Sequence, residues 1–291
     1  MKATSRWRMA GAAVLVGAVL VAAPSGDIGW QRAQAQEVAP PLPLGTAFVA
    51  LQLNLCNSGE AACYARYNNG RSVAEAAAVI ADRRPDVVTL NEVCRSDVTD
   101  GLHPALARNF PGERTFAEFL PAGDPANGGR PYRCRNGEEY GIGVIGRVPA
   151  ATANVPIRVF KGRYPQQDPG SGELRVWLCV AAPASYAACT THLAATSAPL
   201  AMRQCRHLLN VEVPAMRAAI GARVPVVVAG DLNLRYGGST SAQGCVPRGW
   251  FRRGDGHVQH FMATGNLTIG SGTRVDLRHT DHRGWQVTVE P

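Results

Sequence analysis

The stretch that most constrains this chain runs over residues 224–233, with the sequence Val-Pro-Val-Val-Val-Ala-Gly-Asp-Leu-Asn. Its β-branched run predicts a buried strand that ends at Gly230, just before Asp231 and Asn233. Side chains alternate along a strand, so residues two positions apart point the same way. The sequence therefore predicts a strand that delivers a carboxylate and an amide to one place. A strand followed by an ordinary Asx turn has the same sequence pattern. The residues at the other strand ends must therefore distinguish a site from a turn.

Polar residues also stand at the ends of other predicted strands. Strands expected over 46–54, 86–90 and 187–191 lead to Asn54, to Asn91 and Glu92, and to His192. Asp281 and His282 precede a last strand over 285–289, and further strands are expected over 140–145, 174–180 and 258–263. Repeated polar strand ends favour a site over an isolated turn.

The predicted helices fill the intervals between these strands. Ser72 and Glu75 form a capping-box pattern that opens a helix with one apolar face, and Pro85 ends it. A short helix is expected near 102–110 within an otherwise loop-rich region, 95–135. Residues 197–220 are expected to be mostly helical, with an interruption at Pro214.

The N-terminus predicts export. Lys2, Arg6 and Arg8 precede an uncharged run over 9–23, and Ala33-Gln34-Ala35 fits a small-residue cleavage pattern. We expect a secretory signal peptide over 1–35, a Pro-rich tether over 36–45, and one folded domain over 46–291. A membrane anchor that stays attached is the alternative. The expected product is a secreted, extracellular monomer.

The eight cysteines fit this compartment. An even number behind a secretion signal predicts disulfides, and none has the Cys-x-x-Cys spacing of a zinc site. Short spacing and a predicted hairpin favour two local pairs, Cys56–Cys63 and Cys179–Cys189. The simplest remaining pairs are Cys94–Cys134 and Cys205–Cys245, although sequence alone does not fix them.

The charge balance favours an anionic partner. The formal net charge is +8, and the expected leader holds four of the positive charges and one negative charge, leaving +5 on the mature chain. Lys161 is the only lysine after the leader, so nearly all positive charge is arginine, which grips phosphate bidentately. Codon bias in a GC-rich genome gives the same composition.

The polar strand ends, in this order, resemble the endonuclease/exonuclease/phosphatase superfamily, the deoxyribonuclease-I-like fold. The pieces that carry the resemblance are Leu53-Asn54, Leu90-Asn91-Glu92-Val93, Gly141 to Arg147, Thr191-His192-Leu193, Gly230 to Asn233, and Thr280-Asp281-His282. The resemblance implies an α/β (α+β) fold, a four-layer sandwich of two mixed β-sheets packed face to face with helices outside. It also implies an active site at one rim of the sandwich.

The resemblance assigns roles to the strand-end residues. Asn54 and Glu92, with Asp281 beside them, would hold a divalent metal, Mg2+ by preference, with Mn2+ or Ca2+ as substitutes. Asp231 and Asn233 would position the attacking water and a phosphate oxygen. His192 and Arg175 would bind the phosphate, and His282 would activate the water. The chain has no Gly-x-Ser-x-Gly elbow and no zinc-type histidine cluster, which argues against serine hydrolase and zinc phosphoesterase chemistry.

One position departs from the family pattern. Many members have an aspartate that pairs with the catalytic histidine, and the matching residue here is Gln259. A glutamine orients an imidazole but does not stabilise its cation as a carboxylate does. Either Asp255 or Asp276 substitutes for that aspartate, or His282 works without a carboxylate, or activity is weak. A catalytically weak binding protein on the same scaffold is therefore a real alternative to an enzyme.

The substrate is the remaining question. A basic, arginine-rich chain favours nucleic acid, so the expected activity is a secreted nuclease. Sphingomyelinase, phospholipase-like and phosphoinositide phosphatase activities are the alternatives. Trp250 and Phe251, expected in a loop beside arginines, would seat in a membrane interface, stack on bases, or form a partly buried pair.

Overall fold

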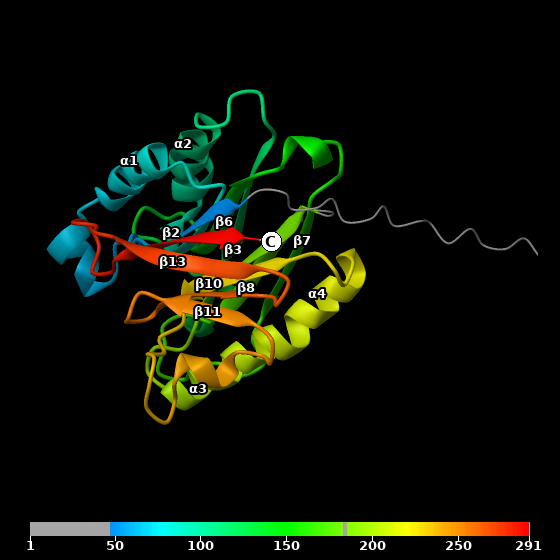
Figure 1. The fold of residues 1–291 in the computed structure, drawn as a ribbon. Helices are drawn as coiled ribbons and strands as arrows, with labels where there is room; N and C mark the ends of the chain where they lie inside the picture. Colours follow the sequence, from blue (N-terminus) through cyan, green and yellow to red (C-terminus); the bar gives the residue numbers. More distant parts are fainter. Residues whose placement is uncertain (1–46, 183–184, 291) are drawn as a thin grey trace, which may run out of the picture. The chain divides into compact units, whose positions relative to one another are not determined.

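The computed structural model describes residues 47–182 and 185–290, so the expected signal peptide and tether lie outside the described part of the chain. Two six-stranded sheets form its centre (Figure 1). The first sheet has the spatial order β13 (Thr268–Val275), β14 (Gly284–Glu290), β1 (Phe48–Asn54), β2 (Val87–Cys94), β6 (Tyr140–Arg147) and β3 (Thr115–Pro121). The second has the order β11 (Phe251–Gly254), β12 (Gln259–Ala263), β10 (Val226–Asp231), β9 (Tyr186–His192), β8 (Val176–Ala182) and β7 (Arg158–Arg163). A short ribbon pairs β4 (Gly123–Asp124) with β5 (Arg130–Pro131).

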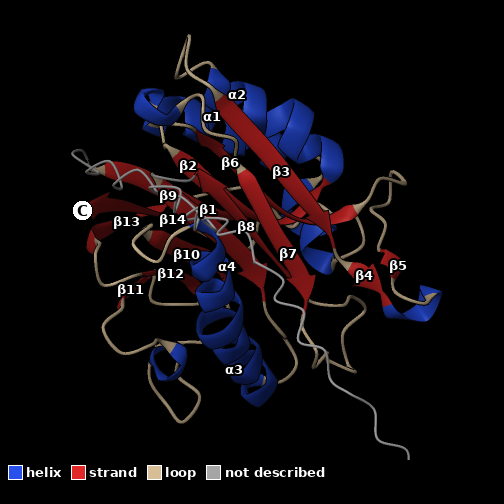
Figure 2. Cartoon of the chain, turned by 90° about the vertical axis from the view of Figure 1, so that its right-hand side faces the viewer, coloured by secondary structure: helices blue, strands red, loops and turns tan. Residues whose placement is uncertain are grey.

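Helices cover the outer faces of the two sheets. Helices α1 (Ser72–Arg83) and α2 (His103–Ala107) lie on the first sheet, and α3 (Ala198–His207) and α4 (Val213–Ile220) lie on the second (Figures 1 and 2). One apolar cluster fills the space between the sheets, and one lies under each helical layer. Each sheet is mixed, because β1 with β2 and β9 with β10 are parallel pairs among antiparallel ones. The predicted four-layer sandwich is confirmed.

Strand β10 shows how the sequence specifies this layering. Val227 and Ala229 belong to the cluster between the sheets, whereas Val226 and Val228 belong to the cluster under α3 and α4. Alternate side chains thus face opposite layers, and both layers are apolar. A continuous β-branched run is what such a doubly covered strand requires.

The strand pairing gathers the polar strand ends at one rim. Asn54 at the end of β1 pairs with Asn91 of β2. In the second sheet, Asp231 pairs with His192 on one side and with Gln259 on the other. The two sheets face each other, so these ends converge on one place.

The secondary-structure predictions missed the edge strands β7, β11 and β13, and they fail in two further regions. Ser72 does not cap α1: Arg71 is the N-cap, and the Glu75 carboxylate instead accepts hydrogen bonds from the backbone N–H groups of Arg278 and His279. The region 95–135 contains the strand β3, so it is not simply loop-rich. The buried and partly buried residues of β3 alternate irregularly, so the sequence of this strand lacks the regular alternation of a strand.

The remaining boundaries agree closely with expectation. The helix predicted over 197–220 is divided into α3, a π-helical turn at Leu208–Glu212, and α4, which has Pro214 in its first turn. The four disulfides are Cys56–Cys63, Cys94–Cys134, Cys179–Cys189 and Cys205–Cys245, as predicted. Four disulfides fit an oxidising compartment. No helix within the described ranges has the length and apolar character needed to cross a membrane.

Gly230 is required where β10 approaches β9. A Cβ atom at this position would lie 2.0 Å from the carbonyl oxygen of Thr191. We therefore expect Gly230→Ala to lower the free energy of unfolding by about 1–3 kcal/mol, the usual cost of overpacking, as measured by urea denaturation. Gly244→Ala is the matched control, because its Cβ would have no contact shorter than 3.5 Å, the distance to Met202 Cε. Equal stability of the two variants would contradict this account of the β9–β10 contact.

Candidate active site

Glu92 has a strained backbone conformation that places its side chain at the rim of the sandwich where the polar strand ends meet. Its φ angle is 55°, and the register of β2 with β6 shifts between Asn91 and Val93. Non-glycine residues rarely adopt this conformation, and such strain gathers at functional sites. The amide of the fully buried Asn54 donates a 2.7 Å hydrogen bond from Nδ2 to Glu92 Oε1. The bulge and the amide together fix the Glu92 carboxylate.

Asp231 is the centre of the polar network. Its side chain is fully buried, and Oδ2 accepts hydrogen bonds from Asn54 Nδ2 at 3.1 Å and from Gln259 Nε2 at 2.9 Å. Oδ1 accepts from the backbone N–H of Asn233 at 3.0 Å, which is the Asx turn considered from sequence. Asn233 has a φ angle of 49° and donates from Nδ2 to the carbonyl oxygen of Leu193. The Asx turn and the site are therefore not alternatives, because the same turn positions Asp231 and Asn233 at the rim.

Arg175 and His192 present polar atoms without partners. Among the described residues, Arg175 Nε and Nη1 and His192 Nδ1 are buried and have no hydrogen-bond partner. Arg175 Nη1 lies 2.9 Å from Glu173 Oε1, an ion pair by distance that lacks hydrogen-bond alignment. Arg175 stands directly before β8, one residue outside the strand in which it was expected. Buried donors of this kind are costly unless a ligand satisfies them.

Glu173 is a member of the site that sequence reasoning missed. Its Oε1 accepts a hydrogen bond from the Tyr140 hydroxyl at 3.3 Å and lies 4.0 Å from His192 Nδ1. A signal was present, because Glu173 and Arg175 are two residues apart at the start of an extended segment and so point the same way. Glu173 belongs to the side of the site occupied by His192 and Arg175.

His282 lies opposite His192, between three polar groups. Its Nε2 is 3.5 Å from Asp231 Oδ2 and 3.6 Å from Asp281 Oδ1, and its Nδ1 is 3.4 Å from Gln259 Nε2. The hydrogen bond to Asp231 fixes which end of the Gln259 amide is NH2. Gln259 therefore presents a donor to His282 Nδ1. This amide favours the tautomer with its proton on Nε2, the opposite of the tautomer an aspartate would select.

A cavity of about 410 Å³ opens between these groups. Its lining includes Glu92, Arg175, His192, Asp231, Asn233 and His282, together with Glu173, Tyr132, Tyr140 and the loop of Ser58, Glu60 and Ala61. Asn54 and Gln259 lie beneath the lining, as buried supports of Asp231. The Asp281 side chain is 39% exposed and reaches the site only through His282. The structure thus brings every predicted site residue to one place.

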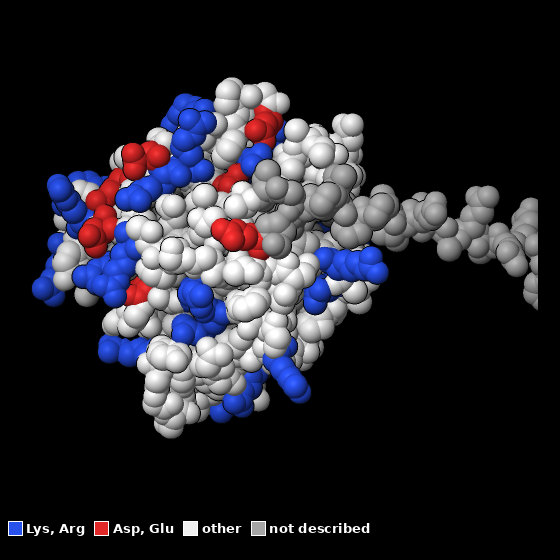
Figure 3. All heavy atoms as spheres, viewed as in Figure 1, with Lys and Arg blue, Asp and Glu red and all other residues white. Residues whose placement is uncertain are grey.

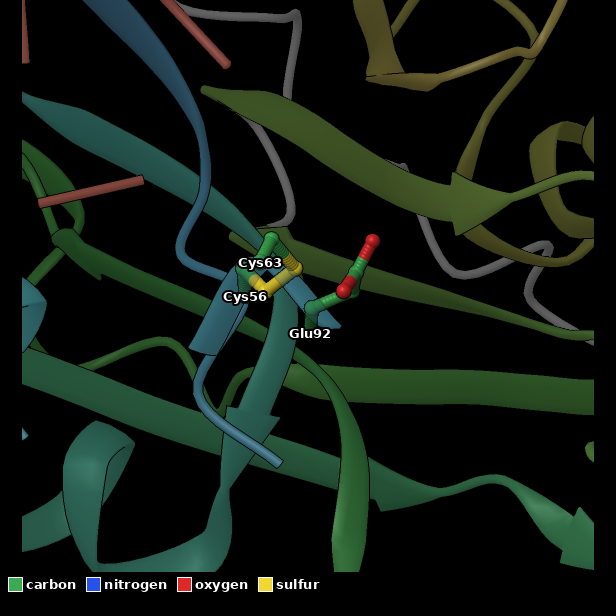
Figure 4. A group of neighbouring side chains, drawn as sticks. All are labelled: Cys56, Cys63 and Glu92. Carbon is green, nitrogen blue, oxygen red and sulfur yellow. A yellow bond between two sulfur atoms is a disulfide. The ribbon is translucent and has the colours of Figure 1, made fainter. Parts of the chain in front are cut away.

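The donor atoms suit a hard cation that keeps its waters. One group of three potential ligands lies close together in the described part of the chain: Cys56, Cys63 and Glu92 (Figure 4). The two sulfur atoms form a disulfide, so neither is available as a thiolate ligand. What remains is the Glu92 carboxylate, which shares the Asn54 NH2 group with the Asp231 carboxylate, whereas Asn54 Oδ1 accepts from the backbone N–H of Cys56. Mg2+ is typically bound through one or two carboxylates and several waters, so these residues fit it.

Burial shifts the pKa of several groups in the cavity, Glu92 and His192 among them. Burial raises the pKa of Glu92 from 4.5 to about 7, with a further rise from the charge of Glu173 and an opposing effect of the Asn54 hydrogen bond. Burial lowers the pKa of His192, and the positive charges of Arg175 and His282 lower it further. At neutral pH the His192 ring is therefore uncharged and carries one N–H donor. Glu92 is poised to exchange a proton for a cation.

Comparisons with known proteins agree with this geometry. A model of the Endonuclease/Exonuclease/phosphatase family matches residues 51–282, from β1 to His282. A search of the curated proteins found no match.

Several solved structures share the fold. An endonuclease/exonuclease/phosphatase from Beutenbergia cavernae DSM 12333 has 21% sequence identity and a TM-score of 0.54, with 84% of this chain and 71% of that chain covered. The human Nocturnin catalytic domain with bound sulfate has 15% identity and a TM-score of 0.53, with coverages of 84% and 93%. A mannosyl-6-phosphatase from Bacteroides thetaiotaomicron VPI-5482 has 12% identity and a TM-score of 0.53, with coverages of 83% and 99%. The structural likeness supports the fold, and the match over 51–282 shows that the chain belongs to the Endonuclease/Exonuclease/phosphatase family of hydrolases.

Proposed function

We propose that this protein is a secreted Mg2+-dependent phosphodiesterase that cleaves nucleic acid. The observation that carries the proposal is the set of buried polar atoms without partners, on Arg175 and His192, lining the same cavity as Glu92 and Asp231. These donors lie next to carboxylates, with His192 Nε2 3.9 Å from Glu92 Oε1 and Arg175 Nη1 2.9 Å from Glu173 Oε1, which matches a phosphate bound to a cation. An anion without a cation would meet repulsion from Glu60, Glu92, Glu173 and Asp231, which also line the cavity.

Glu92 would hold the metal, with Asp281 reaching it through solvent. Asn54, which the resemblance assigns to the metal, instead positions the Glu92 carboxylate through its NH2 group. The bound cation would supply Lewis-acid stabilisation of charge on the phosphate oxygens. The remaining work falls to the chain's own residues. Arg175 Nε and Nη1 would bind phosphate oxygens, and the neutral His192 would donate its N–H to the same group.

The water-activating side of the site is built around His282. Asn233 and Asp231 would orient the attacking water, and His282 would take its proton at Nε2 as the bond from the water oxygen to phosphorus forms and the bond to the leaving oxygen breaks. The released oxygen would take a proton from solvent. This step needs the His282 tautomer with its proton on Nδ1, which the Gln259 NH2 group disfavours. The imidazolium that results lies within 3.5 Å of Asp231 Oδ2 through Nε2, so the negative charge that supports it is Asp231. Gln259 opposes that state, because the imidazolium needs a hydrogen-bond acceptor at Nδ1 and finds an NH2 group.

The position of Trp250 and Phe251 supports a nucleic acid rather than a lipid substrate. Phe251 begins the edge strand β11, so it does not lie in a loop as expected, and Trp250 packs partly buried against the cluster under α3 and α4. Phe251 pairs with Ala263, which pairs with Val227, four residues before Asp231. At about 3.3 Å per residue, this sets Phe251 on the order of 13 Å from the catalytic rim. A membrane contact there would hold the cavity away from the bilayer.

Turnover with and without metal tests the proposal. Single-stranded DNA, RNA, sphingomyelin and a phosphoinositide are assayed side by side after chelation and after readdition of Mg2+. We expect polynucleotide cleavage that is lost on chelation and restored by Mg2+, and that Glu92→Gln abolishes. Glu290→Gln, at the exposed end of β14, is the matched control. Faster lipid turnover would refute the substrate, and no turnover with Mg2+, Mn2+ or Ca2+ would favour a binding protein.

The pH dependence of metal binding gives an independent readout. Because the proton on Glu92 competes with the cation up to its pKa of about 7, the Mg2+-induced rise in Tm should be small at pH 5.5 and larger at pH 8. Without metal the sign is opposite: the folded state holds this proton more tightly than the unfolded state, so this contribution to stability is lost as pH rises from 4.5 to about 7. Glu92→Gln should remove both trends in thermal unfolding scans.

Gln259→Asp tests the pairing with His282. A carboxylate would accept a hydrogen bond from Nδ1–H and favour the imidazolium, so the acidic limb of the pH–rate profile should move to higher pH. Gln259→Asn has the same length without the charge and should leave the limb in place. A limb that stays fixed in the aspartate variant would mean that position 259 does not set the protonation of His282.

Export predicts two features of the mature protein, cleavage after Ala35 and eight oxidised cysteines. Intact mass spectrometry of the secreted protein, after alkylation without a reductant, measures both. We expect a chain that starts at Gln36 and takes up no alkyl groups. Several alkylated cysteines, or an intact leader on soluble protein, would be incompatible with export.

A further inference from the structure

The sequence from the site to the end of β13 has an unusual charge balance. Residues 232–275 contain five arginines, Arg235, Arg248, Arg252, Arg253 and Arg274, and a single acidic residue, Asp255, a formal excess of four positive charges. Asp255 is buried, and its Oδ1 accepts hydrogen bonds from the backbone N–H groups of His257 and Gln259. The only negative charge of this segment is therefore directed inward.

The fold brings four of these five arginines, all but Arg248, to the neighbouring edges of the two sheets. The edge strands β11 and β13 of the two sheets lie against each other, and Arg274 Nε donates to the carbonyl oxygen of Asp255 at 3.0 Å. Arg235, two residues after Asn233, donates to His257 Nε2 at 2.9 Å. In Figure 3, the charged side chains on the part of this face below β13 are almost all basic.

An exposed ring lies within this surface. The Tyr236 side chain is on a residue that is 66% exposed, and the Arg252 guanidinium carbon lies 4.6 Å from the centre of the ring. Arg252 is itself fixed, because it donates to His260 Nδ1 at 2.9 Å and to Gln243 Oε1 at 3.0 Å. The ring is thus supported from one side by a guanidinium and open on the other. We call Arg235, Tyr236, Arg252, Arg253 and Arg274 the arginine strip.

The strip is free to take an anionic partner. Within the described ranges, the arginines that form ion pairs with carboxylates lie elsewhere: Arg83, Arg95, Arg135, Arg147, Arg175 and Arg283. Arginines without carboxylate partners, placed around an aromatic ring, are typical of sites that bind single-stranded nucleic acid. The guanidinium groups bind phosphates, and a base stacks on the ring.

We propose that the arginine strip binds a single-stranded polynucleotide and leads it into the cavity. This inference rests on the proposed function and specifies its substrate. The phosphate-binding candidates Arg175 and His192 are only 4% and 7% exposed, so the bond to be cleaved must enter the cavity. A flexible single strand does this readily, whereas a duplex holds its backbone and bases in place. Anionic lipid fits less well, because interfacial binding needs a buried apolar face that the strip does not offer.

Binding in the presence of a chelator tests the strip without cleavage. Labelled single-stranded DNA, single-stranded RNA and a duplex are titrated by fluorescence anisotropy at several salt concentrations. Removing three phosphate contacts with Arg235→Gln, Arg253→Gln and Arg274→Gln together should weaken binding at least 10-fold and lower the slope of log K against log salt by about 2. The matched control removes three exposed arginines from α1, the end of α2 and β7: Arg83→Gln, Arg108→Gln and Arg158→Gln.

Tyr236→Leu isolates stacking, and should weaken single-strand binding about 10-fold without a change in the salt slope. Phe251→Leu, remote from the cavity, should bind like the unsubstituted protein. Equal affinity for duplex, equal weakening by the control triple variant, or stronger strip-dependent binding to phosphatidylserine vesicles would each overturn the proposal. The DNA and RNA arms identify which polynucleotide is held.

A small diester separates this proposal from the proposed function. Turnover of bis(4-nitrophenyl) phosphate uses the cavity alone, so the strip variants should hydrolyse it at the unsubstituted rate while losing polynucleotide cleavage. If the unsubstituted protein cleaves no diester but still binds single strands through the strip, the phosphodiesterase proposal fails and this one stands. If the protein cleaves the diester but does not bind single strands through the strip, the strip proposal fails and the phosphodiesterase proposal stands.

Discussion

The carboxylate of Asp231 is the constraint on which the rest of this structure depends. It is fully buried, and it is shared between the sheets: Asn54 donates to it from the first sheet and Gln259 from the second. A buried charge needs such partners, since losing one of them typically costs several kcal/mol. The packing of the sheets and the geometry of the catalytic rim are therefore secured by the same hydrogen bonds.

A second layer of amides extends this network across the sandwich. Gln52 donates from Nε2 to Asn91 Oδ1 at 2.7 Å and to Gln259 Oε1 at 3.1 Å. Asn91 Oδ1 also accepts from the backbone N–H of Asp231 at 2.8 Å. Neutral amides can satisfy one another's hydrogen bonds without burying a charge. The residues beneath the site therefore hold it rigid, while the charged groups face the cavity. Glu92, Arg175 and His192 occupy that outer position, where a cation and an anion would complete them.

The sequence predicted the parts of the molecule where pattern and burial coincide. β10 is a β-branched run covered on both faces, and its polar end marked Asp231 and Asn233. The edge strands were harder to detect: β7 and β13 are largely exposed, so no apolar alternation identified them. The capping box failed because tertiary contacts to the backbone of Arg278 and His279 took the Glu75 carboxylate. Glu173 was overlooked because its importance comes from Tyr140 and His192, which lie far from it in sequence.

The two local disulfides differ in their accessibility to solvent, and this determines which of them is reduced first. Cys179 and Cys189 are fully buried within the cluster under α3 and α4, where a reductant has no access while the fold persists. The bond between Cys56 and Cys63 lies at the cavity beside Glu92 (Figure 4), with Cys63 partly exposed. It closes the loop that carries Ser58, Glu60 and Ala61 along the cavity wall. Because access governs thiol–disulfide exchange, a reducing environment would loosen the mouth of the cavity before it reached the sandwich. The cavity wall would therefore lose its cross-link while the sandwich kept its own, so the shape of the cavity depends on an oxidising environment more directly than the fold does.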